Sequence, residues 1–264
     1  MNKLSFLSLT LLFFTACNNT TATALEPKVE KPQAPKIITA PLPSVEKPTI
    51  SIPSDSSQLL LVTTDNWSTK NGTLQRYERT NNQWVKVGES LSIVIGRNGL
   101  GWGKGLHTTP SNAQYIKKEG DGKAPAGLFS LGSGFGYSST NFEMKFPYAT
   151  YKTTDHCVDD SSSQWYNQII DSKKIAKDYK SFEHMKMRNN LYKYGITVNH
   201  NPQQITQGGS CIFIHIKNKS GKGTAGCTAM REDEIVTILK WLKENKKPLL
   251  LQLPEEEMVK VHLN

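Results

Sequence analysis

Residues 211–230 have the sequence CIFIHIKNKSGKGTAGCTAM, in which a histidine and a cysteine flank a polar, glycine-containing segment. The apolar residues around His215 predict an interior strand, because such residues fit a pleated, buried surface. Side-chain alternation along this strand puts His215 and Cys211 on one face. The segment 216–226 is polar and glycine-rich, so we expect it to fold back and bring Cys227 close to His215.

Cys227 is the residue in this stretch with the strongest potential for chemistry. We expect a helix over residues 230–245 just after it, and a helix N-terminus stabilises negative charge and lowers a thiol pKa. A neighbouring His215 would serve as its base. Gly226 permits close backbone approach, and N–H groups at and after Cys227 could receive an oxyanion. The alternative is that both residues are ordinary buried residues.

The rest of the chain predicts an α+β domain that is mainly β. Its helices are fewer than its strands and do not alternate with them, which argues against a parallel α/β fold. In the helix at 230–245, apolar residues recur at i, i+3, i+4 and i+7, and acidic residues precede basic ones. A second helical segment is expected over 161–193. Strands are expected at 59–63, 73–77, 83–87, 91–95, 128–131, 196–198, 211–216 and 249–253.

Composition narrows the class of protein. The 264 residues contain 32 Lys plus Arg against 23 Asp plus Glu and 37% hydrophobic residues, typical of a folded protein. The lysines are scattered with no aromatic and arginine stripe, so no nucleic-acid partner is expected. The absence of a CxxC pair argues against a zinc ribbon. The positive charge favours an anionic substrate such as carboxylate-bearing cell wall. We expect a monomer.

The N-terminus has the pattern of a bacterial lipoprotein. Residues 1–16 form a short signal peptide, since the thirteen mostly apolar residues 4–16 fall short of the roughly 20 that span a bilayer. Small residues precede Cys17, which predicts cleavage there and a lipid on Cys17. The alternative is an ordinary secretory signal. A proline-rich linker is expected over 17–56, a catalytic domain over 57–254 and a tail over 255–264.

The sequence GTAGCTAM after IFIHI resembles the active-site segment of YkuD-type L,D-transpeptidases. The matching positions are His215, Thr224, Gly226 and Cys227. Upstream, GKAPAGLF at 122–129 and VIGR at 94–97 are similar to the stretches that precede the active site in that family. CVDD at 157–160 and GSCIFIH at 209–215 are similar to segments of its lipid-anchored or secreted branch. The resemblance spans about residues 90–252.

The resemblance implies a β-sandwich or barrel domain that acts on peptidoglycan stem peptides. Cys227 would attack the amide that follows the third stem residue, and His215 would be the base and then the acid. The backbone carbonyl of Ile216 would orient His215, and Gly226 would shape the oxyanion-hole turn. Thr224 and Thr228 would lie at the substrate. No metal or organic cofactor is implied. The acyl-enzyme would meet an amine, giving a 3-3 cross-link or a protein attachment, or water.

Two positions depart from the family pattern. Better-known members have a second histidine at the place of Ala225 and an arginine or asparagine at that of Ala229, so the substrate-carboxylate contact is in question. Three rival functions therefore stay open. One is a carboxypeptidase or endopeptidase on the same fold, another is a non-catalytic wall-binding lipoprotein, and the third is a zinc site on His215, Cys211 and Cys227.

Cys157 and Cys211 are the two remaining cysteines. An oxidising, exported compartment favours a disulfide between them. The alternatives are two free, buried thiols, or a bond between Cys211 and Cys227. Near Cys157, Asp159 and Asp160 are expected to cap the helix predicted from Ser161, because Ser161 and Gln164 have the spacing of a capping box. The alternative is that the paired aspartates bind a metal or a substrate amine.

Overall fold

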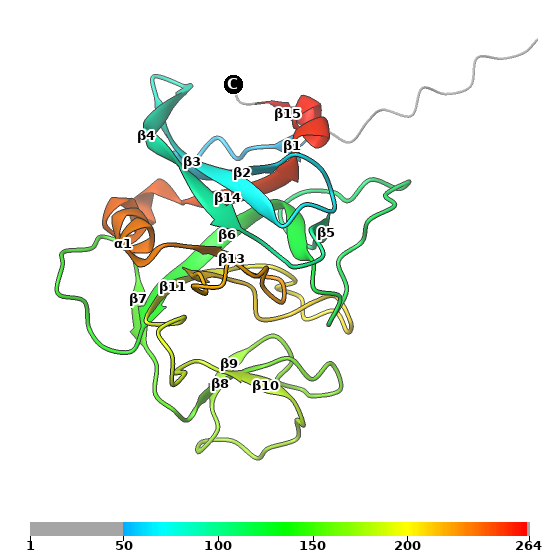
Figure 1. Cartoon of the computed structure of the whole chain (residues 1–264), viewed down its shortest axis with the longest axis vertical. Helices are drawn as coiled ribbons and strands as arrows, with labels where there is room; N and C mark the ends of the chain where they lie inside the picture. The colour runs from blue at the N-terminus through cyan, green and yellow to red at the C-terminus, as the bar shows by residue number, and fades with distance from the viewer. Residues whose placement is uncertain (1–49, 263–264) are drawn as a thin grey trace, which may run out of the picture. The chain divides into compact units, whose positions relative to one another are not determined.

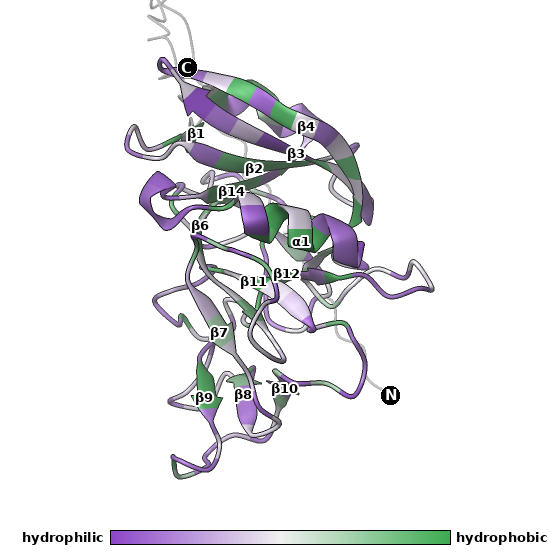
Figure 2. Ribbon diagram, turned by 90° about the vertical axis from the view of Figure 1, so that its left-hand side faces the viewer, coloured by the Kyte–Doolittle hydropathy of each residue, from purple (hydrophilic) through white to green (hydrophobic). Residues whose placement is uncertain are grey.

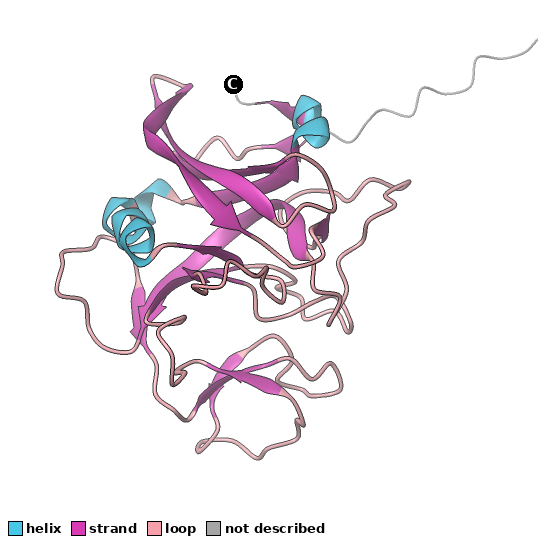
Figure 3. Cartoon of the chain, viewed as in Figure 1, coloured by secondary structure: helices cyan, strands magenta, loops and turns pink. Residues whose placement is uncertain are grey.

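The structure, a computed structural model, describes residues 50–262. Strands dominate these residues, as Figure 3 shows. The helices are α1 (Glu232–Trp241) and two short 3-10 helices, η1 (Glu244–Lys246) and η2 (Glu255–Lys260). The expected fold class, mainly β with few helices, is confirmed. No helix in this part of the chain is long and apolar enough to cross a membrane. The expected signal peptide, Cys17 and linker residues 17–49 lie outside the described residues.

The largest sheet closes on itself. Its strands are β2 (Gln58–Thr64), β3 (Asn71–Thr80), β4 (Gln83–Val94), β5 (Leu100–Trp102), β6 (Ala124–Gly136), β7 (Tyr148–Thr150), β11 (Tyr194–Val198), β12 (Phe213–Ile216), β13 (Thr228–Met230) and β14 (Leu249–Pro254). The order is β11-β12-β13-β4-β3-β2-β14-β6, and β6 pairs again with β11 (Figure 1). Strands β5 and β7 are added to β6. Closure of the sheet removes free edges and encloses a core.

The core is built on the paired strands β2 and β14, which run parallel in the middle of the sheet. Leu59, Leu60, Leu250 and Leu251 are all buried. These strands are continuous apolar runs because both of their faces are covered. Helix α1 adds Ile235, Ile238 and Leu239 to the same core, and Figure 2 shows its mixture of hydrophobic and hydrophilic residues.

A second, three-stranded sheet occupies the region where a helix was expected. It consists of β8 (Asp155–Val158), β9 (Ile169–Asp171) and β10 (Phe182–His184), with β8 in the centre. The helix predicted over 161–193 is therefore wrong. Instead of capping a helix, the carboxylate of Asp160 accepts hydrogen bonds from the N–H groups of Ser162 and Lys180. Such side-chain bonds compete with the helical backbone pattern.

Two short strands extend the folded unit beyond the predicted boundaries 57 and 254. Strand β1 (Ile50–Ser51) pairs in parallel with β15 (Val261–His262). The last residues of the expected linker and most of the expected tail therefore belong to the folded part. Ile50 is buried in the main core, which gives this pairing an apolar anchor.

Candidate active site

Cys227 and His215 lie on neighbouring strands of the closed sheet. Strands β12 and β13 are parallel, and their register sets Ile214 beside Thr228. Cys227, one residue before β13, is thus level with Phe213, whose N–H donates to the Cys227 sulfur over 3.3 Å. Phe213 and His215 share a face of β12 by alternation. The fold-back expected from the sequence brings the thiol and the imidazole to the same face.

The protonation of His215 is fixed by its backbone neighbour. Its Nδ1 lies 2.8 Å from the carbonyl oxygen of Ile216. A carbonyl only accepts hydrogen bonds, so Nδ1 carries the ring proton and Nε2 keeps a free lone pair. Burial lowers the pKa of His215 to about 4, although the bond to Ile216 opposes this shift. At neutral pH the imidazole is therefore uncharged and able to accept a proton.

The resting thiol of Cys227 is not activated as the sequence suggested. Helix α1 begins at Glu232, and strand β13 separates it from Cys227, so the helix N-terminus does not act on the sulfur. Burial raises the pKa of Cys227, and the nearby carboxyl of Glu183 raises it further. The expected lowering of the thiol pKa is wrong for this state, because desolvation outweighs the hydrogen bond from Phe213.

The turn before Cys227 is held by Thr224. Its hydroxyl donates to the carbonyl of Cys227 over 2.6 Å and accepts the N–H of Gly226 over 3.1 Å. The N–H of Gly226 is thus engaged, while no acceptor within residues 50–262 takes the N–H of Cys227. A Cβ at Gly226 would lie 3.0 Å from the carbonyl oxygen of Lys123. The close approach explains the glycine, and the N–H of Cys227 is the free donor of this turn.

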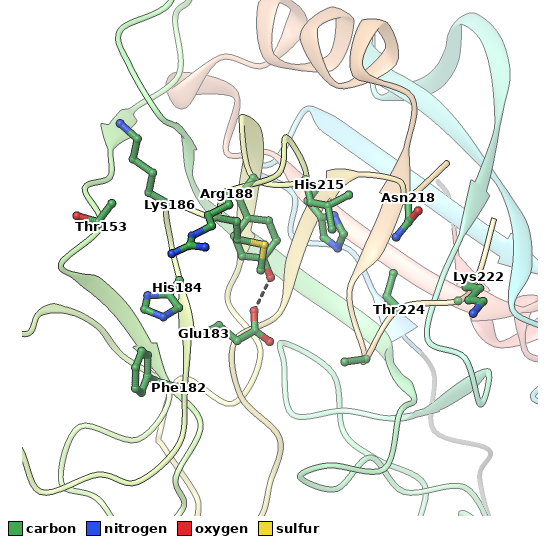
Figure 4. A pocket seen from close by; sticks show the side chains of 15 residues that line it. Thr153, Phe182, Glu183, His184, Lys186, Arg188, His215, Asn218, Lys222 and Thr224 are labelled. Atoms are coloured by element: carbon green, nitrogen blue, oxygen red, sulfur yellow. Dashed lines mark hydrogen bonds between the residues drawn. The ribbon is translucent and has the colours of Figure 1, made fainter. Parts of the chain in front are cut away.

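A cleft of about 820 Å³ opens beside His215. One wall is formed by residues 182–192 and the other by residues 215–225 (Figure 4). Lys186 and Arg188 line the first wall and Lys222 lines the second. Among the ion pairs of the described residues, none involves these three cations. The cleft therefore presents unneutralised positive charge next to the imidazole.

Comparison with known proteins identifies the family. Residues 67–251 match the family model YkuD, the L,D-transpeptidase catalytic domain. The chain belongs to this family. A search of curated proteins found no match. Among solved structures, the chain is similar to the helical cell shape determining protein Pgp2 from Campylobacter jejuni, at 14% identity and a TM-score of 0.42. That match covers 77% of this chain and 50% of the other.

Two residues after the cysteine differ from what the family pattern suggests. Thr228, expected at the substrate, is buried, and its hydroxyl donates to Gln252 over 2.7 Å, so that expectation is wrong. Ala229 is fully buried opposite Val94. A long basic side chain has no space there. In this L,D-transpeptidase domain, cationic side chains reach the cleft from Lys186, Arg188 and Lys222 instead.

A disulfide joins Cys157 on β8 to Cys211, with Cα atoms 6.0 Å apart. Cys211 has a positive φ of 55° and lies before β12, so it does not share the strand face of His215 as expected. Its carbonyl accepts the Cys227 thiol over 3.5 Å. A sulfur in a disulfide is not a thiolate ligand, which removes Cys211 from the alternative zinc site. No cluster suited to a metal occurs within residues 50–262.

Sequence reasoning missed two residues beside the thiol. The hydroxyl of Tyr192 donates to a carboxylate oxygen of Glu183 (Figure 4, dashed line). The ring of Tyr192 also packs edge-on against His215, with centroids 5.2 Å apart. Burial raises the pKa of Glu183 to about 7. No motif spacing links residues of the 182–192 segment to Cys227, because the folding of the small sheet brings them together.

Proposed function

We propose that this protein is a cell-wall enzyme that transfers stem peptides of peptidoglycan through a thioester on Cys227. One observation carries the proposal: within the matched region 67–251, Cys227 directly precedes β13 and lies on the same face as His215 of the paired strand β12, with the His215 tautomer set by Ile216. A neutral imidazole with a free Nε2 is the form needed for a general base. No metal or cofactor takes part in this scheme.

The proposed reaction begins with Cys227. Its thiol proton passes to Nε2 of His215 while the sulfur attacks the amide carbonyl that follows the third stem residue. The developing oxyanion is stabilised by the free N–H of Cys227. The C–N bond then breaks, and His215 gives its proton to the departing amine. A thioester remains, and an acceptor amine resolves it into a new amide.

The cations of the cleft support an anionic substrate. Stem peptides carry carboxylates, and Arg188 offers the paired donors that suit them. Lys186 stands on the same wall and Lys222 on the opposite one. Because Ala229 replaces the family's usual basic or amide side chain, these residues are our candidates for the carboxylate contact.

Muropeptide analysis tests the function. Wild-type protein and the Cys227→Ser variant are incubated with disaccharide tetrapeptides, and the products are separated by mass spectrometry. Cys227-dependent cross-linked dimers are expected. Tripeptide monomers alone would indicate the hydrolase, a carboxypeptidase or endopeptidase. Identical products from both proteins would overturn the enzymatic function and favour a wall-binding lipoprotein.

We also propose that the protein is exported and anchored to a membrane by a lipid on Cys17. The signal-like residues 1–16 and the small residues before Cys17 support this. Metabolic acyl labelling of wild type and Cys17→Ala tests it. Loss of label and of membrane association in the variant is expected. An unlabelled wild type would contradict the anchor.

A further inference from the structure

The Cys227 thiol has a neighbour that the proposed reaction does not use. The Tyr192 phenol is buried beside the sulfur, and each affects the pKa of the other. Tyr192 and Cys227 pack in one buried cluster with Phe213 and the Cys157–Cys211 disulfide. The ring of Tyr192 packs edge-on against Phe213, whose N–H donates to the Cys227 sulfur, so the buried cluster holds the phenol on the same side as the thiol.

The phenol has a single proton, and in this structure it is given to Glu183. Its oxygen then offers only lone pairs to the sulfur, so it can accept from the thiol but cannot donate to a thiolate. Protonation of Glu183 changes this, because a carboxylic acid can donate to the phenol oxygen. The Tyr192 proton is then free to turn toward Cys227.

The loss of charge on Glu183 favours the Cys227 thiolate, and so does a hydrogen bond donated by Tyr192. Ionised Glu183 opposes negative charge on Cys227 and raises the thiol pKa, whereas the contact with Tyr192 lowers it. Glu183 is only partly exposed, on the cleft wall. Both effects favour the thiolate when Glu183 is neutral.

We propose that Tyr192 is a further catalytic residue, whose hydroxyl donates to the Cys227 sulfur when Glu183 is protonated, and that Glu183 is the positioning residue that controls it. This inference rests on the proposed role of Cys227 as the nucleophile. It lowers the thiol pKa on the acid side of neutrality, where Glu183 takes up its proton, and so flattens the rise of the thiolate with pH.

Other charged groups surround the pair. Asp159 and Glu119 raise the pKa of Glu183, and Lys117 lowers that of Cys227. Lys117 is buried and paired with Asp121 over 2.6 Å, so its charge is largely balanced. Lys186 and Arg188 stand on the same cleft wall as Glu183, and Lys222 stands on the opposite wall. The imidazole of His184 also lines the cleft beside Glu183. Glu183 is the acid among the residues that line the cleft, and the one bonded to the phenol.

Alkylation of Cys227 by iodoacetamide measures the thiolate without any wall substrate. The full chain is treated between pH 5.5 and 9, and the Cys227 peptide is quantified by mass spectrometry. For a simple thiol the rate rises about tenfold per pH unit below its pKa. Wild type should rise less steeply around pH 7, where Glu183 ionises and the thiol pKa increases. A uniform tenfold rise across this range would overturn the proposal, and this measurement needs no variant.

Glu183→Gln mimics the neutral carboxyl. The alkylation rate of this variant should rise uniformly with pH and match that of wild type at pH 5.5. At pH 8 it should exceed the wild-type rate about tenfold, because a thiol pKa lower by about one unit gives about ten times more thiolate. Tyr192→Phe should slow alkylation about tenfold at pH 5.5 by removing a donor to a charged sulfur. A slower Glu183→Gln, or a Tyr192→Phe equal to wild type, would overturn the proposal.

A matched control uses Tyr166, a second buried tyrosine that donates to a glutamate, Glu119, over 2.5 Å. Tyr166→Phe should keep the less steep rise of wild type, displaced at most along the pH axis, since Tyr166 bonds to Glu119, which acts on Glu183. The two proposals also fail separately. Muropeptide products that do not depend on Cys227 would contradict the proposed function. Cys227-dependent products, together with identical alkylation profiles in wild type and Glu183→Gln, would contradict only this inference.

Discussion

The two walls of the cleft are built differently. One wall starts from the closed sheet: His215 lies on β12 and Cys227 directly precedes β13, and every residue of these two strands is buried. On the other wall, Glu183 lies on β10 of the small sheet and Arg188 lies in the segment that follows it, and β9 and β10 are at most half-buried. The groups proposed to form the thioester are thus fixed in a core, whereas Glu183 and Arg188 stand on a less embedded wall.

Different interactions stabilise the two sheets behind these walls. The closed sheet rests on apolar burial around β2 and β14. The small sheet rests on the disulfide at Cys157 and on stacked rings, with His156 and Phe182 centroids 3.7 Å apart. Local stability follows buried apolar contact, so the small sheet should open at a lower free energy than the closed sheet.

Leu251→Ala should damage both walls together. Leu251 is fully buried on β14, between Leu61 of β2 and Leu128 of β6. Truncating such a residue costs about 2–5 kcal/mol of unfolding free energy because it leaves a cavity. Urea denaturation measures the loss. Val259→Ala, at a residue 77% exposed, is the matched control and should change little. A loss under about 1 kcal/mol in Leu251→Ala would show that β14 is not the centre of the core.

Removing the disulfide should destabilise the small sheet more than the closed sheet. The Cys157→Ser/Cys211→Ser double variant opens a link of 54 residues in sequence, and such links contribute about 2–4 kcal/mol. Hydrogen exchange by mass spectrometry should show faster exchange in β8 and β10, with β14 nearly unchanged. Equal acceleration in both sheets would mean that they open as one cooperative unit, which would contradict the lower opening free energy expected for the small sheet.

Local sequence patterns predicted the closed sheet well where burial is continuous. The apolar runs at 59–63 and 249–253 became β2 and β14, because few other structures bury such runs on both faces. The small sheet was missed because its strands have three or four residues and mixed polarity. Pairing with β8 decides their conformation, and a window of local sequence contains no information on that partner.

The same limit applies to the site. His215, Cys227 and Thr224 could be found because they lie within thirteen residues around a turn. The raised pKa of the Cys227 thiol could not be predicted, because it depends on burial and on Glu183, which only the tertiary fold places nearby. The predicted helix at 230–245 was right in type but too early in its start, because Met230 pairs with Ile216 as part of β13.

Acid should weaken the wall of the closed sheet through its buried histidines. Burial lowers the pKa of His215 to about 4 and that of His200 to about 3. Both are neutral when folded but take protons near pH 6.5 when unfolded. Their stabilising effect is complete above pH 6.5 and is lost as pH falls toward 4. Between pH 6 and 5 each should cost up to about 1.4 kcal/mol.

Urea denaturation at pH 7, 6 and 5 checks this loss. Replacing the buried His200 by Gln should reduce the pH dependence. Unchanged stability between pH 7 and 5 in wild type would show that the imidazoles are hydrated in solution, and would contradict the burial on which the neutral His215 depends.

Arg188→Gln should have the smallest effect on stability and still alter substrate binding. Arg188 is exposed on the polar wall and has no ion pair among the described residues, so its loss should change unfolding free energy by less than about 0.5 kcal/mol.

If it binds a substrate carboxylate, KM for a tetrapeptide muropeptide should rise about tenfold with kcat unchanged, because ground-state and transition-state binding fall together. The KM of wild type should also rise with salt, and that of the variant less so. Lys173→Gln, at an exposed cation just after β9 and outside the cleft, is the matched control. A fall in kcat or a lower melting temperature in Arg188→Gln would show that the polar wall also supports the catalytic wall, and an unchanged KM would remove Arg188 from the carboxylate contact.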